Sequence, residues 1–196
     1  MIAENCNYQH SDILQMMQEG LNKAMEAHGS YTGASCEKLA PNNEVLIDDI
    51  KSSLSSNIDN IYVVVTNLMG KLRGRNLLIF STNELERLKK LISEGELSGN
   101  EEMTKAFLLE IGNIVAAASI TIYANKTDVR IMGGVPNLYH CTFSELDRFL
   151  HNQEHESNFT LKYWTHYSAT NSPGAWCVWL FDDEVQRIFD QKRTAV

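Results

Sequence analysis

Two copies of one pair of polar residues occur on predicted helices of this 196-residue chain. Glu19 and Asn22 form the first pair, and Glu110 and Asn113 form the second, each within a Glu-x-x-Asn sequence. Residues three apart on an α-helix lie side by side on its surface. Each pair would therefore present a carboxylate, which accepts hydrogen bonds, beside a carboxamide, which both accepts and donates them. Such a pair is suited to meeting a partner rather than to packing in a core.

The second pair interrupts an otherwise apolar stretch, residues 107–123. The apolar residues that fall on one helical stripe are Phe107, Ile111, Ile114, Val115, Ala118 and Ile122. This spacing predicts a core helix, in which an outward carboxylate is not needed for packing. The small residues Ala106, Ala116 and Ala117 would let a partner approach the pair closely. A membrane span is the alternative interpretation, but the charge of Glu110 at mid-span argues against it.

Composition excludes several functional classes. The net charge is −8 and no basic run is present, which argues against binding to nucleic acid or to an anionic membrane surface. The four cysteines are scattered without CxxC or zinc spacing, so we expect reduced thiols and no metal site. Residues 1–12 are polar and lack the apolar region of a secretory signal, so we expect a cytoplasmic protein.

Hydrophobic periodicity and turn residues predict a similar order of elements twice along the chain. The expected helices cover residues 10–28, 83–94, 101–124, 143–152 and 182–192. The expected strands cover residues 44–50, 61–69, 75–81, 129–135, 159–169 and 175–181. Residues 29–42 and 51–60 are expected to be loops. We further expect His28-Gly29 to stop the first helix, Asn83 to cap the second, and Pro136 to end the strand before it.

The interval between the two pairs indicates internal repetition. The glutamates are 91 residues apart, and so are the asparagines. We expect one domain over residues 1–196, made of half-repeats at about 8–95 and 96–196. Its fold class would be α/β of the α+β type, with about six mostly antiparallel strands. The two long helices that carry the pairs would pack on the shared sheet about a pseudo-twofold axis.

The second pair belongs to a longer motif. Glu110 and Asn113, followed after 22 residues by Pro136, resemble the Glu-x2-Asn-x22-Pro motif of the CheC/CheX/FliY family of chemotaxis phosphatases. The resemblance covers nearly the whole chain, including the glycine-flanked turn at 70–74 and the last strand after Gly174. Because two pairs are present, the layout is most similar to CheC, which carries two sites, whereas CheX carries one.

This sequence departs from the family motif at two points. The family has Asp or Ser four residues before the glutamate, where this chain has Gln15 and Ala106. The first pair has Val45 at the position of the proline, and Pro41 lies four residues earlier. The first pair therefore matches the motif less well than the second.

The resemblance implies hydrolysis of the aspartyl phosphate on a phosphorylated CheY-type response regulator. In this interpretation Asn113, and Asn22 if the first pair is active, orients the attacking water. Glu110 and Glu19 dock the partner, and Pro136 holds the strand end near the helix. The protein needs no cofactor of its own, because the regulator carries the Mg²⁺.

A non-catalytic binding module is the alternative. The family fold also serves in the flagellar motor switch, and CheC proteins bind the receptor deamidase CheD. The departures from the motif favour this alternative. A third interpretation is an unrelated α/β enzyme with a pocket site.

Overall fold

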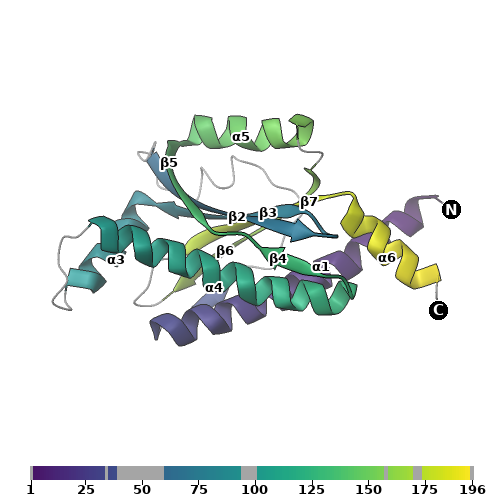
Figure 1. The fold of residues 1–196 in the computed structure, drawn as a ribbon, viewed down its shortest axis with the longest axis horizontal. Coiled ribbons are helices and arrows are strands. Elements are labelled where there is room, and N and C mark those ends of the chain that lie inside the picture. The colour runs from purple at the N-terminus through teal and green to yellow at the C-terminus, as the bar shows by residue number, and fades with distance from the viewer. Residues whose placement is uncertain are drawn as a thin grey trace.

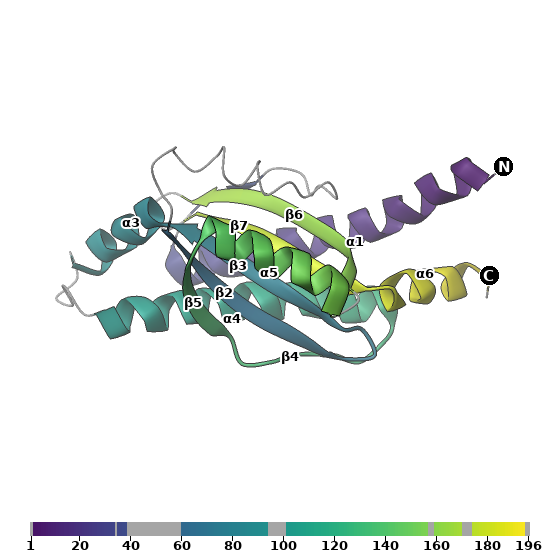
Figure 2. The ribbon, with the colours of Figure 1, turned by 90° about the horizontal axis from the view of Figure 1, so that it is seen from above.

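The computed structural model describes residues 2–33, 35–38, 60–93, 101–156, 159–169 and 174–194. In this part of the chain one sheet separates two helical layers, as Figures 1 and 2 show. Helices α1 (Ile2–Thr32) and α4 (Glu101–Thr127) cover one face of the sheet, and α5 (Phe143–Glu156) lies over the other. Helices α3 (Thr82–Ser93) and α6 (Glu184–Thr194) lie at opposite ends of the molecule.

The sheet confirms the predicted α+β class with mostly antiparallel strands. Its strands are β1 (Cys36–Lys38), β2 (Asn60–Gly70), β3 (Gly74–Ser81), β4 (Ile131–Gly133), β5 (Asn137–Thr142), β6 (Phe159–Ala169) and β7 (Ala175–Asp182). The order across the sheet is β1-β6-β7-β3-β2-β4, and β5 also pairs with β2. All these pairs are antiparallel. Because β4 and β5 share one edge, the strands fill six positions, and the two predicted hairpins form β2–β3 and β6–β7.

The predicted strand over residues 129–135 is wrong in extent. Strand β4 pairs with β2 only up to Gly133, and the chain resumes pairing at Asn137 as β5, which has no counterpart among the predicted strands. Pro136 lies in the break between them and does not end the edge. An edge position tolerates proline because its missing N–H removes no ladder hydrogen bond from a central strand.

Helix α1 is longer than predicted at both ends. The expected stop at His28 is wrong, because His28 is fully buried inside the helix. The helix instead ends at Thr32, whose Oγ1 donates to the His28 carbonyl at 2.8 Å. Gly33 follows with a φ of +69°, the left-handed conformation that commonly closes helices. Residues 29–32, expected to be loop, therefore belong to α1.

Side-chain caps begin helices α3 and α5, and the residue that caps α3 is not the expected one. Ser81, not Asn83, caps α3, because the Glu84 N–H donates to Ser81 Oγ at 3.1 Å. At α5 the Thr142 N–H donates to Glu145 Oε2 at 2.7 Å, and the Glu145 N–H donates back to Thr142 Oγ1 at 3.2 Å. This reciprocal pair is a capping box. The predicted strand over residues 44–50, with Val45, and the loop residues Pro41 and 51–59 lie outside the described residues.

The two faces of the sheet bury separate apolar clusters. Successive residues of a strand point to opposite faces, so Val64 of β2 joins the cluster under α1 and α4. Val63 and Val65 join the cluster under α5. Helix α4 is long and apolar enough to cross a membrane by length and composition. However, its buried residues pack in the larger cluster, so α4 serves as a core helix of this fold.

Candidate functional site

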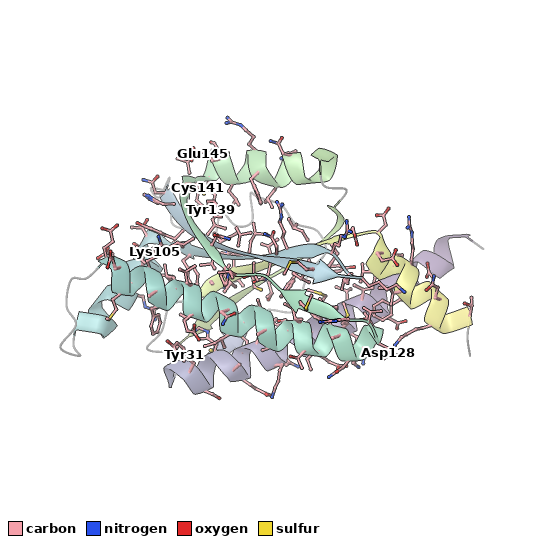
Figure 3. All side chains as sticks on the ribbon, in the orientation of Figure 1. Tyr31, Lys105, Asp128, Tyr139, Cys141 and Glu145 are labelled. Atoms are coloured by element: carbon pink, nitrogen blue, oxygen red, sulfur yellow. The ribbon has the colours of Figure 1, made fainter. Side chains whose placement is uncertain are left out.

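Helices α1 and α4, which carry the two Glu-x-x-Asn pairs, pack against each other in antiparallel directions. Ser119 of α4 donates through Oγ to the Gly20 carbonyl in the middle of α1, at 3.3 Å. Near the end of α1, the ring of Tyr31 lies 5.5 Å from the ring of Phe107, near the start of α4; Tyr31 is labelled in Figure 3. The helices approach closely, since a Cβ on Gly20 would lie 2.4 Å from Cε1 of Tyr123.

Buried positions on α1 recur on α4 at the interval that separates the pairs. Among residues 12–32 of α1, eight are buried, and the residues 91 positions later on α4 are buried in seven cases. The seven matched positions are Ile13/Thr104, Met17/Leu108, Gly20/Ile111, Leu21/Gly112, Ala24/Val115, Met25/Ala116 and His28/Ser119. The two Glu-x-x-Asn pairs therefore hold equivalent positions relative to the buried stripes of their helices. The division of the whole chain into half-repeats at 8–95 and 96–196 stays a prediction.

Both pairs lie on the accessible side of the α1–α4 layer, which covers the sheet face opposite α5 (Figure 1). Asn22, Glu110 and Asn113 are exposed, and the Glu19 side chain keeps 36% of its surface accessible. None of the four side chains is part of the core. Their roles in catalysis stay predictions, and the geometry places both pairs where another protein can reach them.

The first pair is engaged by neighbouring side chains. Lys126 of α4 donates through Nζ to Oε1 of Glu19 at 2.7 Å, which also accepts from Nε2 of Gln15 at 3.1 Å. The hydrogen bond from Lys126 lowers the pKa of Glu19 below its ordinary value. Gln18 donates through Nε2 to Oδ1 of Asn22 at 3.2 Å. A partner would have to displace these contacts to use the first pair.

The second pair has no such contacts. Among the residues that the structure describes, none forms a hydrogen bond or ion pair with the side chains of Glu110 and Asn113. Ala106 and Ala117 are exposed beside them, whereas Ala116, expected to share that surface, is buried in the core. The carboxylate and the carboxamide of the second pair are thus both available to a partner.

Gly112 fixes the backbone that carries Asn113. A Cβ on Gly112 would lie 2.5 Å from Cγ1 of Val64, so α4 rests directly on β2 at this point. Sequence reasoning missed this role, although a glycine inside a helical pattern is itself a signal of close packing. Lys126 was also missed, and no local signal could have found it, because its contact with Glu19 depends on how two helices pack.

Pro136 is half-buried in the break between β4 and β5, and both of these strands contact α4. On β4, a Cβ on Gly133 would lie 3.1 Å from Cδ1 of Ile120. The edge that contains Pro136 is therefore held against the helix that carries the second pair. No described contact joins the proline to Glu110 or Asn113, so its supporting role stays a prediction.

Comparison with known proteins finds similarity in structure only. No protein-family model and no curated protein matches the sequence. FliY of Thermotoga maritima matches over 93% of this chain and 94% of its own, with a TM-score of 0.64 and 14% identity. A chain of the CheX–CheY–BeF3–Mg complex of Borrelia burgdorferi matches over 85% and 97%, with a TM-score of 0.56 and 13% identity. The FliM middle domain of Vibrio alginolyticus matches over 92% and 98%, with a TM-score of 0.55 and 7% identity.

Proposed function

We propose that this chain, which has the fold of the CheC/CheX/FliY proteins, is a chemotaxis phosphatase acting on a phosphorylated CheY-type response regulator. The observation that carries the proposal is the exposed Glu110–Asn113 pair on α4, which no described residue engages. The likeness to a chain of a CheX–CheY complex supports the class of partner. The reaction would take place in the cytoplasm, as the sequence leads us to expect.

In the proposed reaction, the main task of the phosphatase is to position the attacking water. An aspartyl phosphate is an activated acyl phosphate, and the regulator supplies the Mg²⁺ beside it. Catalysis then consists of placing one water in line with the phosphorus. The carboxamide of Asn113 suits this task, because its oxygen accepts from the water and its neutral charge does not repel the phosphoryl oxygens.

Glu110 serves as the docking group in this mechanism. Its carboxylate lies one helical turn from Asn113 on the same surface, where it can pair with a cation of the regulator. That ion pair would set how deeply Asn113 enters the partner's site. Gly112 contributes indirectly, because its contact with Val64 holds this part of α4 on the sheet.

The first pair contributes less in our proposal. Glu19 is already bound by Lys126, so a cation of the regulator must compete with an ammonium of the same chain. Asn22 likewise accepts a hydrogen bond from Gln18. The α4 pair is therefore the principal site and the α1 pair a weaker second one.

A non-catalytic binding module of the motor-switch type is the second candidate. The likeness to the FliM middle domain, which spans 98% of that chain, favours it. So do Gln15 and Ala106, which stand where the family has Asp or Ser. In this case the exposed pairs would bind the regulator without accelerating loss of its phosphate.

Dephosphorylation of the regulator separates the two candidates. Phosphorylated CheY-type regulator is mixed with the wild-type chain or with the double variant Asn22→Ala/Asn113→Ala, and phosphate release is followed beside binding. We expect the wild-type chain to accelerate release and the double variant to bind without doing so. Binding by the wild-type chain with release at the spontaneous rate would establish the non-catalytic module instead.

A further inference from the structure

An exposed aromatic ring lies where α1 ends beside α4. The ring of Tyr31, in the last turn of α1, packs against the ring of Phe107 on α4, with the ring centroids 5.5 Å apart. Tyr31 nevertheless keeps 45% of its surface accessible, whereas Phe107 is half-buried. We call these two residues the aromatic shelf. A tyrosine that packs on one side only leaves ring surface for a partner, and tyrosine is enriched among the residues that dominate binding energy at interfaces.

The aromatic shelf is adjacent to the carboxylate of the α4 pair. Phe107 and Glu110 are three residues apart on α4, so their side chains are neighbours on its surface. Lys105 is two residues before Phe107 and therefore projects from another side of the helix. Figure 3 shows Lys105 on the side of α4 toward the sheet and Tyr31 on the side toward α1. The accessible surface thus runs from the ring of Tyr31 over Phe107 to Glu110.

Three features of this surface attract a cation. The Glu110 carboxylate is negatively charged, and the face of an aromatic ring carries negative electrostatic potential. The last turn of α1, which contains Tyr31, is the negative end of the helix dipole and contains no basic residue. An anionic group would be repelled by all three, and an apolar group would leave the carboxylate desolvated without a partner. The surface therefore selects a cationic side chain, and arginine suits it best, because a guanidinium both pairs with carboxylates and stacks on rings.

The first pair has no equivalent of the aromatic shelf. At the interval of 91 residues, Phe107 corresponds to Met16, which is fully buried, and Tyr31 corresponds to Ile122, which is half-buried. The carboxylate of the first pair is instead bound by an ammonium of the same chain. Packing of the two helices therefore does not require an exposed ring at this position, and the shelf distinguishes the α4 pair from the α1 pair.

We propose that Tyr31 is a specificity-determining residue of the α4 pair, and that its ring and the Glu110 carboxylate hold the same cationic side chain of the regulator. This inference rests on the proposed function, in which the regulator supplies that cation. Phe107 precedes Glu110 by three residues and Asn113 follows it by three, so the shelf lies on the far side of Glu110 from the carboxamide. The ring therefore acts on the affinity for the regulator and not on the rate of the chemical step.

The test measures affinity for a CheY-type regulator held in its active state by beryllofluoride and Mg²⁺. All proteins are full-length and carry Glu19→Gln, so that binding reports the α4 pair. Tyr31→Leu, which keeps apolar surface but removes the ring, should weaken binding about five- to thirtyfold, and Tyr31→Phe should weaken it less than about twofold. Tyr139→Leu changes an exposed tyrosine on the other face of the sheet and should leave the affinity unchanged. The rate of dephosphorylation at saturation should be the same in all of these variants.

A double-mutant cycle tests whether the ring and the carboxylate hold the same cation. In a Glu110→Gln background, where the cation has lost its charged partner, Tyr31→Leu should weaken the remaining binding by less than about twofold. Equal losses in the two backgrounds overturn the proposal, and so does an equal loss in Tyr31→Phe and Tyr31→Leu. If Tyr31→Leu fails to fold, Tyr31→Lys replaces it and should weaken binding at least as much, because its ammonium repels the cation.

The same measurements separate this inference from the proposed function. If the regulator binds and is dephosphorylated while Tyr31→Leu retains full affinity, the role of Tyr31 is overturned and the phosphatase stands. If the regulator binds without dephosphorylation, the affinities of the variants still decide the role of Tyr31. If the wild-type chain does not bind the regulator, both proposals are overturned.

Discussion

Val64 of β2 lies directly against Gly112 of α4, with Cγ1 of Val64 only 2.5 Å from where a Cβ on Gly112 would be. The contact sets the distance between the helix and the sheet one residue before Asn113. A glycine in a helix interior normally costs about 1 kcal/mol relative to alanine. Glycine is nevertheless favoured here, because a Cβ at this position would clash with the stiff β-branched side chain of Val64.

Gly112→Ala should therefore destabilise the protein despite the better helix propensity of alanine. Overpacking of this kind costs about 1–3 kcal/mol in the free energy of unfolding. In a Val64→Ala background, where the clashing methyl groups are gone, the same change should be neutral or stabilising. Denaturant unfolding of the four proteins measures both effects. A gain in stability from Gly112→Ala in the wild-type background would show that the contact does not hold the helix.

The ion pair between Lys126 and Glu19 predicts a titration that NMR can follow. Lys126 lowers the pKa of Glu19 from its ordinary value of 4.5, so Lys126→Gln should raise it back toward that value. Lys105→Gln, at an exposed α4 residue labelled in Figure 3, is the matched control and should leave the Glu19 titration unchanged. The Glu19 side-chain carboxyl carbon reports the titration directly. No difference between the two variants would mean that the ion pair does not form in solution.

The same ion pair governs stability as a function of pH. A folded-state pKa below the unfolded value favours folding above the unfolded value, and this contribution disappears as the pH falls through the folded pKa. The stability advantage of the wild-type chain over Lys126→Gln should therefore be full above about pH 4.5 and disappear as the pH falls through the lower folded-state pKa of Glu19. High salt should reduce the gain, since the pair is exposed.

Removing the Lys126 ammonium should also increase the dephosphorylation activity of the first pair, Glu19 and Asn22. In an Asn113→Ala background, where the α4 pair is inactive, Lys126→Gln leaves Glu19 open to a cation of the regulator. We expect the remaining dephosphorylation rate to rise by no more than about fivefold, because an exposed ion pair is weak and competes only modestly with a cation of the regulator. Adding Asn22→Ala should remove the increase. A rise that survives Asn22→Ala would place its origin outside the α1 pair.

Buried His28 should make the protein sensitive to mild acid. Burial lowers the pKa of His28 from 6.5 to about 4, so the folded state holds this histidine neutral where the unfolded chain protonates it. Stability is full above pH 6.5 and falls as the pH drops toward 4, by up to about 3 kcal/mol.

Variants isolate this effect from the titration of carboxylates. The stability of the wild-type chain relative to His28→Leu should decrease between pH 6.5 and 4 in denaturant unfolding. If this comparison is flat, burial does not lower the pKa of His28 in the folded state.

Elements with a local pattern were predictable from the sequence. The apolar stripe of α4 and the alternation in β6 are properties of consecutive residues, and both elements occur where expected. Strand β5 was missed because its side chains are exposed or half-buried and show no alternation. Its conformation comes from pairing with β2, which is distant in sequence.

The candidate site was likewise predictable from the sequence only in part. Both Glu-x-x-Asn pairs could be found from spacing alone, because side chains three apart share a helix face. The difference between the pairs could not be found, since Lys126 reaches Glu19 only when α1 and α4 pack in antiparallel directions. The misread end of α1 has a similar cause: His28 and Gly29 suggest a stop in sequence, but packing buries His28 within the helix.

The central claim is that Asn113 positions the water that attacks the regulator's phosphate. The most direct test compares the rate of dephosphorylation of a CheY-type regulator by Asn113→Ala with the rate by Asn22→Ala, at saturating variant. We predict that Asn113→Ala loses about a hundredfold or more, the scale of a positioning effect, and that Asn22→Ala loses far less. A wild-type rate from Asn113→Ala would contradict this mechanism.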